Sequence, residues 1–272
     1  MNDQGHLVEK ETNEIWASAT AYEQFMGRWS RLVAREFVPW LAAPADTTWL
    51  DVGCGTGALT EAIFELASPH YIVGSDESEA YVDFLRHRLT DERLCFDVES
   101  ALGLNFDDEF YGNTVSGLTL NLVSNPRNSA TEMVRVTRPA GIVAAYVWDY
   151  ADEMQLLRYF WKAATELDPS ARALDENMHW MCKPEPLAAL FRDAGLRDVT
   201  TRAIDVSTVF RDFDDYWQPF LSMQGPAPSY VTSLTEERRD ALRDRLHAAL
   251  PIANDGSIPL LARSWAVRGT RQ

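Results

Sequence analysis

Three glycines at alternate positions, Gly53, Gly55 and Gly57, follow an apolar run that begins at Thr48. A helical pattern of apolar residues starts at Ala58, directly behind the last glycine. Glycine adopts backbone conformations that a Cβ would forbid, so such a turn lets the main chain pass close to a ligand. The helix behind the turn directs its N–H groups at the same point. This strand, turn and helix predict a ligand-binding loop at the end of a β-strand.

The spacing of the glycines narrows the class of ligand. A dinucleotide-binding loop reads G-x-G-x-x-G, whereas these glycines alternate strictly and Asp51 precedes them. A Walker-type phosphate loop requires Gly-Lys-Ser/Thr after the turn, and this turn is not followed by it. The loop therefore suits a ligand that is not held by phosphates.

Two further β-rich runs contain an acidic residue at or near their ends. The run 71–76 ends at Asp76, and the run 94–98 carries Asp97 with Val98 after it. A carboxylate at a strand end can accept hydrogen bonds from both hydroxyls of a ribose. A cofactor that contains a nucleoside is the simplest ligand for this order of elements.

The chain resembles the class I S-adenosylmethionine-dependent methyltransferases, whose first motif, D/E-x-G-x-G-x-G, is matched by Asp51, Gly53, Gly55 and Gly57. The resemblance covers about residues 20–205 and the last strand, and it is nearest to the small-molecule branch of the ubiquinone and menaquinone C-methyltransferases. It implies an α/β fold with a doubly wound, seven-stranded, mostly parallel sheet. It also implies that S-adenosylmethionine donates a methyl group, by in-line displacement, to oxygen, nitrogen or carbon of a small organic molecule.

The resemblance further implies roles for residues at the cofactor. Asp76 would bind the ribose and Asp97 the adenine amino group, while the run 114–123 resembles the strand that ends under the methionine moiety. Tyr22 could cover the methionyl group and Arg28 bind its carboxylate, although helix packing or a surface ion pair would explain both equally well. The expected cofactor residues are Tyr22, Arg28, Asp51, Gly53, Cys54, Gly55, Gly57, Asp76, Glu77, Asp97, Val98 and Asn121.

Candidates for the acceptor side are less constrained by the sequence. His179 could take a proton from a hydroxyl or amine acceptor, although a loop histidine is more often not catalytic. Aromatic residues at helical spacing are more often core than pocket, which applies to Trp217. The expected pocket residues are Trp148, Asp149, Trp180 and Trp217.

The pattern of helices and strands predicts how the chain is organised. We expect residues 1–45 to form a polar tail and a helical cap, whose helix runs over about 22–40 until Pro39 and Pro44 stop it, and residues 46–272 to form the methyltransferase domain. Helical insertions at about 152–183 and 213–250 would form a lid. The last strand, 262–267, would pair antiparallel at the sheet edge.

Composition excludes several other functions. A net charge of −16 and a pI near 4.7 would repel a phosphate backbone, so nucleic acid is not expected as a partner. Three cysteines without metal-ligand spacing fit a reduced cytoplasm, and neither a signal peptide nor a membrane span is expected. We therefore expect a cytoplasmic monomer or homodimer without a metal.

Two alternatives stay open at this point. A non-catalytic S-adenosylmethionine-binding protein would keep the same loop and carboxylates but have a blocked acceptor cavity. A nicotinamide-dependent oxidoreductase would need a loop that holds a pyrophosphate, and the glycine spacing does not favour it.

Overall fold

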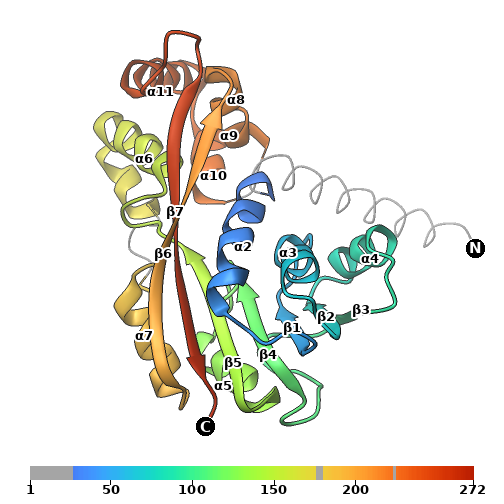
Figure 1. Ribbon diagram of the computed structural model, residues 1–272. Helices are drawn as coiled ribbons and strands as arrows, with labels where there is room; N and C mark the ends of the chain where they lie inside the picture. Colours follow the sequence, from blue (N-terminus) through green and yellow to red (C-terminus); the bar gives the residue numbers. More distant parts are fainter. Residues whose placement is uncertain (1–26, 176–179, 223–224) are drawn as a thin grey trace, which may run out of the picture. The chain divides into compact units, whose positions relative to one another are not determined.

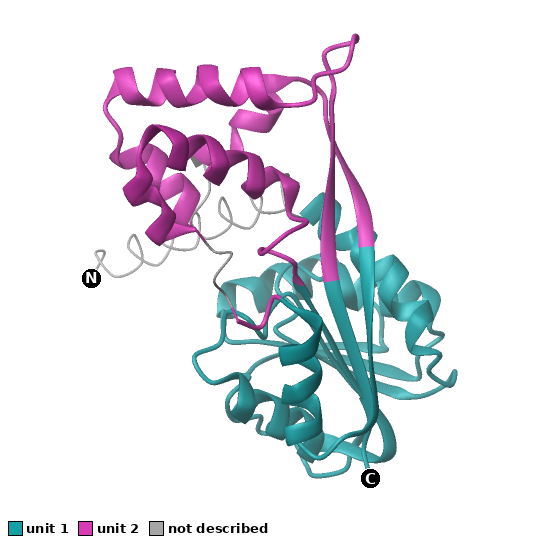
Figure 2. Ribbon diagram, turned by 90° about the vertical axis from the view of Figure 1, so that its left-hand side faces the viewer, with its two compact units in different colours: residues 1–147, 183–204, 265–272 teal, residues 148–182, 205–264 magenta. Residues whose placement is uncertain are grey.

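The computed structural model describes residues 27–175, 180–222 and 225–272. Tyr22 and His179 lie outside the described residues, so their predicted roles stay predictions. The chain forms two compact units (Figure 2). Unit 1 comprises residues 1–147, 183–204 and 265–272, and unit 2 comprises residues 148–182 and 205–264.

One sheet of seven strands has the order β3-β2-β1-β4-β5-β7-β6 (Figure 1). The strands are β1 (Thr48–Val52), β2 (Tyr71–Asp76), β3 (Leu94–Val98), β4 (Tyr111–Gly117), β5 (Thr137–Trp148), β6 (Arg197–Phe210) and β7 (Ile258–Thr270). Strands β1 to β5 pair in parallel. The predicted doubly wound, mostly parallel sheet is confirmed.

The strand order reverses beside β1, which places a ligand site there. From β1 the chain moves outward through β2 to β3, and β4 then returns to the other side of β1. Trp49 of β1 accordingly pairs with Ile72 of β2 on one side and with Asn113 of β4 on the other. In such sheets ligands bind outside the carboxyl ends of the strands at the reversal.

The helices of unit 1 lie in sequence between these strands or before them. They are α2 (Arg28–Leu41), α3 (Ala58–Leu66), α4 (Glu79–Arg88), α5 (Pro126–Val136) and α7 (Pro184–Asp193). Helix α4 begins where the Ser78 hydroxyl accepts the Tyr81 N–H, and α5 begins where the Asn125 side chain accepts the Asn128 N–H. Helix α2 buries an apolar face that includes Val33 and Phe37, as its helical spacing predicts.

Helix α2 contains Pro39 and ends at Leu41, between the two prolines that were predicted to stop it. Two predictions for the strands are wrong. The run 114–123 is not one strand, since β4 ends at Gly117 and Leu118 takes a positive φ of 62° that turns the chain. The last strand does not lie at the sheet edge, because β7 lies between β5 and β6.

Unit 2 is helical, apart from the ends of β6 and β7. Its helices are α6 (Gln155–Leu167), the short 3₁₀ helix η2 (Pro169–Leu174), α8 (Phe213–Trp217), α9 (Pro219–Ser222), α10 (Pro226–Ser233) and α11 (Glu236–Ala249). Aromatic rings form its core, where Phe160 stacks on Phe220 at 4.4 Å between ring centroids. The predicted insertions at about 152–183 and 213–250 fall almost entirely in this unit, and their role as a lid stays a prediction. Across the described part of the chain, every helix is too short or too polar to span a membrane.

Candidate functional site

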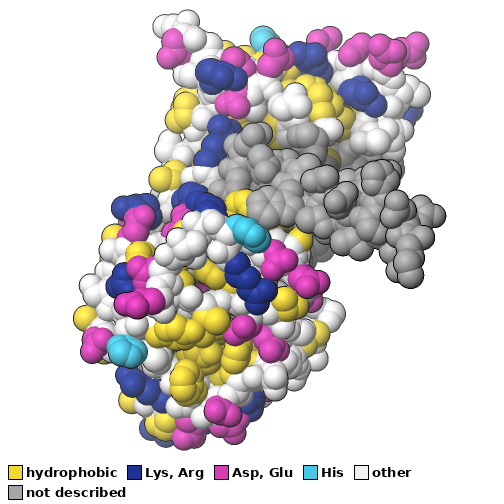
Figure 3. All heavy atoms as spheres, turned by 90° about the vertical axis from the view of Figure 1, so that its right-hand side faces the viewer, with side chains coloured by type: hydrophobic (Ala, Val, Ile, Leu, Met, Phe, Trp, Pro, Cys, Tyr) yellow, Lys and Arg dark blue, Asp and Glu magenta, His cyan; other side chains and the backbone are white. Residues whose placement is uncertain are grey.

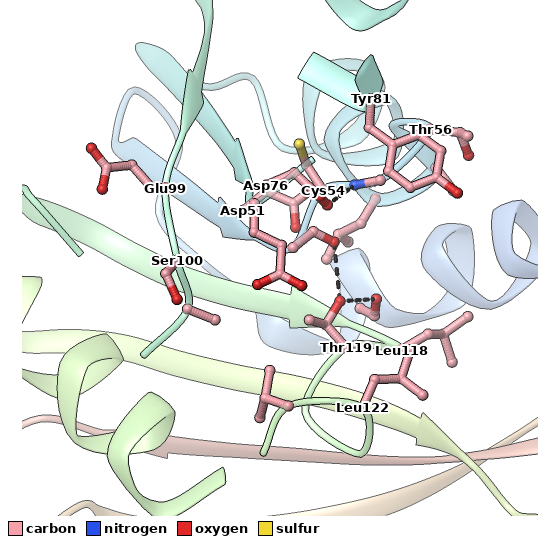
Figure 4. A pocket seen from close by; sticks show the side chains of 18 of the residues that line it. Asp51, Cys54, Thr56, Asp76, Tyr81, Glu99, Ser100, Leu118, Thr119 and Leu122 are labelled. Carbon is pink, nitrogen blue, oxygen red and sulfur yellow. Dashed lines mark hydrogen bonds between the residues drawn. The ribbon is translucent and has the colours of Figure 1, made fainter. Parts of the chain in front are cut away.

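A cavity of about 490 Å³ opens in unit 1 at the carboxyl ends of β1, β2 and β4 (Figure 4). Its wall is formed by the glycine loop, the start of α4 and the segments that follow β3 and β4. Four of the described lining residues are acidic and none is Lys, Arg or His: the acidic ones are Asp51, Asp76, Glu77 and Glu99. The cavity therefore suits a ligand that carries positive charge.

The three glycines of the loop all have positive φ, at 73° for Gly53, 51° for Gly55 and 90° for Gly57. A Cβ on Gly53 would lie 2.4 Å from the Thr119 side chain, so the loop and the segment after β4 meet in close contact. A Cβ on Gly55 would meet no atom within 4 Å. The backbone of the loop is thus open to the cavity at Gly55 and packed against the protein at Gly53.

Asp76, the last residue of β2, ties the loop to α4. Its Oδ2 accepts the Gly55 N–H at 2.9 Å, and its Oδ1 accepts the Ser78 N–H at 3.0 Å. Burial raises the pKa of Asp76 above its ordinary value, and these two hydrogen bonds oppose the rise. An ionised carboxylate has about four acceptor positions, so two backbone donors leave capacity for ribose hydroxyls.

Asp51 lies at the base of the cavity on β1 and is fully buried. Its Oδ2 accepts the Thr60 hydroxyl at 2.7 Å, while its Oδ1 has no hydrogen-bond partner. Burial, together with a smaller contribution from the neighbouring Asp76, raises the pKa of Asp51 to about 7, and the hydrogen bonds from Thr60 oppose the rise. A buried carboxyl oxygen without a partner fits a ligand that brings a donor, such as the ammonium group of S-adenosylmethionine.

Cys54 lies in the same loop but packs into the protein. Its side chain belongs to a buried apolar cluster with Val82, Leu85 and Phe96. Burial, together with Asp51 and Asp76, raises the pKa of the thiol well above its ordinary value. A buried thiol of this kind is unreactive, so the geometry suits a residue that fills space in the loop.

The segment after β3 brings a different acidic residue to the cavity than the resemblance implies. Glu99 and Ser100 line the cavity, whereas Asp97 and Val98 are not among the lining residues. The Asp97 carboxylate lies 4.0 Å from the Cys95 sulfur instead. Sequence reasoning missed Glu99 because it took the acidic residue inside the strand and not the one just beyond its end.

Other lining residues were also absent from the predicted site, among them Tyr81, Thr119, Leu122 and Tyr146. Of the predicted cofactor residues, Gly57, Asn121 and Arg28 lie outside the lining set. Gly57 packs against Leu85, and the Arg28 guanidinium lies 4.9 Å from the Trp29 ring centroid. Side chains two residues apart on a strand point to the same face of the sheet. Tyr146 lies two positions before the predicted pocket residue Trp148, and this spacing could have indicated it.

The predicted acceptor residues Trp148, Asp149, Trp180 and Trp217 belong to unit 2. Trp217 is buried and stacks parallel to Phe213, at 6.5 Å between centroids, so it is part of an aromatic core. Trp180 is about half exposed. Asp149 accepts the Asp152 N–H at 3.0 Å and shapes the turn after β5. Their roles toward an acceptor stay predictions.

In the described ranges, no cluster of three or more His, Cys, Asp or Glu side chains is arranged to hold a metal ion.

Comparison with known proteins agrees with the geometry. Residues 50–145 match the family model of a methyltransferase domain. A demethylmenaquinone methyltransferase of Roseiflexus castenholzii is 31% identical over 176 residues, which cover 60% of this chain and 73% of that protein.

Two solved structures share the fold. One, from Bacillus halodurans, has a TM-score of 0.58 and 14% identity, and the match covers 88% of this chain and 98% of that chain. The other is phosphoethanolamine N-methyltransferase 2 of Haemonchus contortus in complex with S-adenosyl-L-methionine, with a TM-score of 0.56 and 12% identity over 93% of this chain and 56% of that chain.

The glycine loop, the acidic cavity at the strand reversal and the matched family model thus agree on one cofactor and one class of enzyme. The chain belongs to the class I S-adenosylmethionine-dependent methyltransferases of the quinone C-methyltransferase type, and its cofactor is S-adenosylmethionine.

Proposed function

We propose that this enzyme methylates a ring carbon of a lipophilic quinol. The observation that carries the proposal is the apolar wall of the cavity beyond β4, which Leu118, Leu122 and Val123 form. The relative of Roseiflexus castenholzii, a demethylmenaquinone methyltransferase, supports the same acceptor class. Methylation of an oxygen or a nitrogen of another small molecule is the alternative, and the test below distinguishes it from methylation of carbon.

The cofactor residues follow from the polarity of the cavity. Asp76 would accept the ribose hydroxyls, and the partnerless oxygen of Asp51 would accept the ammonium group of the methionyl part. Gly55 leaves room for the ligand to approach the backbone. Glu99, which follows β3 and lines the cavity, would accept the adenine amino group. The aromatic ring of Tyr81 and the carboxylates of the cavity would also attract the positively charged sulfur of the cofactor.

The acceptor would lie at the β4 and β5 end of the cavity. Leu122 is 75% exposed, so it forms an apolar rim rather than part of the core. Leu118 and Val123 are half-buried and line the same cavity. A flat ring with an isoprenoid chain would bury apolar area against these side chains, at roughly 25 cal/mol per Å².

Positioning accounts for most of the expected catalysis. When bound, S-adenosylmethionine supplies a methyl group that is already activated by its positive sulfur. The chain must hold the ligands in line and exclude water, and such orientation contributes roughly 7 to 11 kcal/mol. The short turn at Leu118, fixed by its N–H to the Tyr146 carbonyl at 2.8 Å, keeps this wall of the cavity in place.

The test is methyl transfer from methyl-labelled S-adenosylmethionine to a 2-prenyl-1,4-naphthoquinol kept reduced by dithionite. We expect a product with one added methyl group on a ring carbon, identified by mass and by its NMR shift. Parallel reactions contain a catechol and a primary amine as acceptors. Transfer only to oxygen or nitrogen would overturn the proposed acceptor class, and cofactor binding without any turnover would favour the non-catalytic alternative.

A further inference from the structure

One carboxylate, that of Glu61, joins three helices of unit 1. Glu61 lies in the first turn of α3, close behind the glycine loop, and donates its N–H to the Gly57 carbonyl at 2.9 Å. Its Oε2 pairs with the Arg31 guanidinium of α2, and its Oε1 pairs with the Arg88 guanidinium of α4 at 2.6 Å. Figure 1 shows α3 between these two helices. The two oxygens of one side chain are therefore bonded to two different helices.

Arg88 extends this link to the cavity. While its Nη2 pairs with Glu61, its Nη1 donates a hydrogen bond to the Thr56 carbonyl at 3.0 Å. Thr56 lies between the second and third glycines of the loop and lines the cavity. A guanidinium is planar and rigid, so a partner that orients one of its nitrogens orients the other as well. Glu61 thus fixes the direction from which Arg88 holds the loop.

The second half of the glycine loop has few other restraints of its own. Asp76 holds the Gly55 N–H at 2.9 Å, and the chain then turns through Thr56 to Gly57. Gly57 is the N-cap residue of α3 and has a φ of 90°. A glycine brings no side chain to cap the helix, and it loses more conformational freedom on ordering than any other residue. The bond from Arg88 therefore holds the loop at the point where its own sequence restrains it least.

The α2 side of the link also ends at the cavity. Arg31 follows Ser30, which is buried and lines the cavity. The Ser30 hydroxyl donates to the Gly27 carbonyl at 3.1 Å, so this side chain is fixed within the start of α2. The pair of Arg31 with Glu61 holds the same turn of α2 against α3. Two separate parts of the cavity wall are thus tied to one carboxylate.

A neighbouring ion pair shows what is particular to Glu61. Arg35 and Glu65 join the same two helices one turn further along each of them. Their side chains are 54% and 52% exposed, whereas the side chain of Glu61 is 20% exposed. An isolated exposed pair contributes little, while charges that form a network contribute more. Arg35 and Glu65 also lie outside the cavity lining, so their pair reports on the packing of α2 against α3 alone.

We infer that Glu61 is a positioning residue for the cofactor, although its own side chain is not part of the cavity lining. Through Arg88 it fixes the glycine loop at Thr56, and through Arg31 it fixes the start of α2. A loop that is already ordered binds more tightly, because the ligand does not have to order it. The inference goes beyond the proposed function, since it concerns the cofactor and holds for any acceptor.

The test compares wild type with Glu61→Gln, which keeps the shape of the side chain and removes its charge. By calorimetric titration, affinity for S-adenosylmethionine and for S-adenosylhomocysteine should fall by the same factor, about threefold to tenfold. The loss should be equal because the two ligands share the adenosyl part and differ in charge at the sulfur. Glu65→Gln is the matched control and should change both affinities by less than about twofold.

Two results of this comparison would overturn the inference. A loss for S-adenosylmethionine alone would mean that Glu61 acts by its charge on the cationic sulfur and not by positioning. Equal losses in Glu61→Gln and Glu65→Gln would mean that both residues only hold α2 against α3.

Arg88→Gln tests the same link from its other end, and it also serves if Glu61→Gln does not fold. Because it removes the donor to the Thr56 carbonyl, it should lower both affinities to a similar extent. In the double variant the loss of affinity should be smaller than the product of the two single losses, since both changes break one link. The Tm of each variant is measured in parallel. Single losses that multiply in the double variant would contradict a shared path from Glu61 through Arg88 to the loop.

Discussion

At the scale of single residues, Asp51 combines a structural and a binding role. One of its oxygens is satisfied by Thr60, and the other faces the cavity without a partner. Desolvation is the main cause of its raised pKa, about 7 compared with an ordinary value of 3.8. An acid whose pKa is higher in the folded than in the unfolded state stabilises the fold at low pH. That stability is fully present below about pH 4 and is lost as the pH rises to about 7.

We therefore predict that the ligand-free protein loses stability between pH 5 and pH 8 and that Asp51→Asn loses less. Two pKa units correspond to about 3 kcal/mol, which is the upper limit for the difference between the two proteins over this range. Urea unfolding at both pH values measures it. The same variant should bind S-adenosylmethionine more weakly, because the amide cannot offer a charge to the ammonium group. If the free energy of unfolding changed with pH equally in both proteins, the buried Asp51 carboxyl would not be the cause of the pH dependence.

A second prediction at single residues concerns which acidic residue, Glu99 or Asp97, binds the adenine of the cofactor. Because Glu99 lines the cavity and Asp97 lies beside Cys95, we predict that Glu99→Ala weakens binding of S-adenosylmethionine about tenfold, the value of one hydrogen bond. Asp97→Ala should change it less than about twofold. Calorimetric titration of both variants decides between them, and the opposite order would restore the assignment that the family resemblance implies.

Among the secondary-structure elements, the sequence predicted a strand well where local residue preferences alone determine where the strand begins and ends. The runs 71–76 and 94–98 coincide with β2 and β3, and the apolar run that begins at Thr48 coincides with the start of β1. The end of β4 could not be predicted in the same way. Leu118 and Thr119 continue the apolar and β-branched pattern, and only tertiary contacts with Gly53 and Tyr146 end the strand at Gly117.

The contact between the glycine loop and the end of β4 leads to a prediction. Gly53→Ala combines a positive φ with overlap against Thr119, so it should destabilise the protein by about 2 kcal/mol or more and weaken cofactor binding. Gly103→Ala is the matched control, since a Cβ there meets no atom within 4 Å, and it should change stability by less than about 1 kcal/mol. Urea midpoints measure both. A Gly53→Ala protein with the stability of wild type would refute the close packing of the loop.

At the scale of the whole molecule, the cofactor site belongs to one unit. Every described residue that lines the cavity is in unit 1, and the predicted lid segments fall almost entirely in unit 2. On the face drawn in Figure 3, basic side chains alternate with acidic ones over the coloured part of the surface. The net charge of −16 and the acidic cavity make the molecule better suited to a cationic cofactor than to a polyanion.

Sequence alone could not assign the acceptor side, because insertions have no shared motif and their aromatic residues serve a core as readily as a pocket. Trp217 illustrates this, since it is buried in the aromatic core of unit 2. By contrast, the cofactor half follows a motif whose spacing is dictated by the backbone conformations at Gly53, Gly55 and Gly57.

We expect the cavity of unit 1 to bind S-adenosylmethionine through Asp76. Isothermal titration of wild type and Asp76→Ala with S-adenosylmethionine, S-adenosylhomocysteine and NAD tests it most directly. We predict micromolar binding of both adenosyl ligands to wild type, none of NAD, and a loss of at least tenfold in affinity in the variant, since two ribose hydrogen bonds are removed. Binding of NAD alone would contradict the assignment of the cofactor, and unchanged affinity in Asp76→Ala would contradict the role of Asp76 at the ribose.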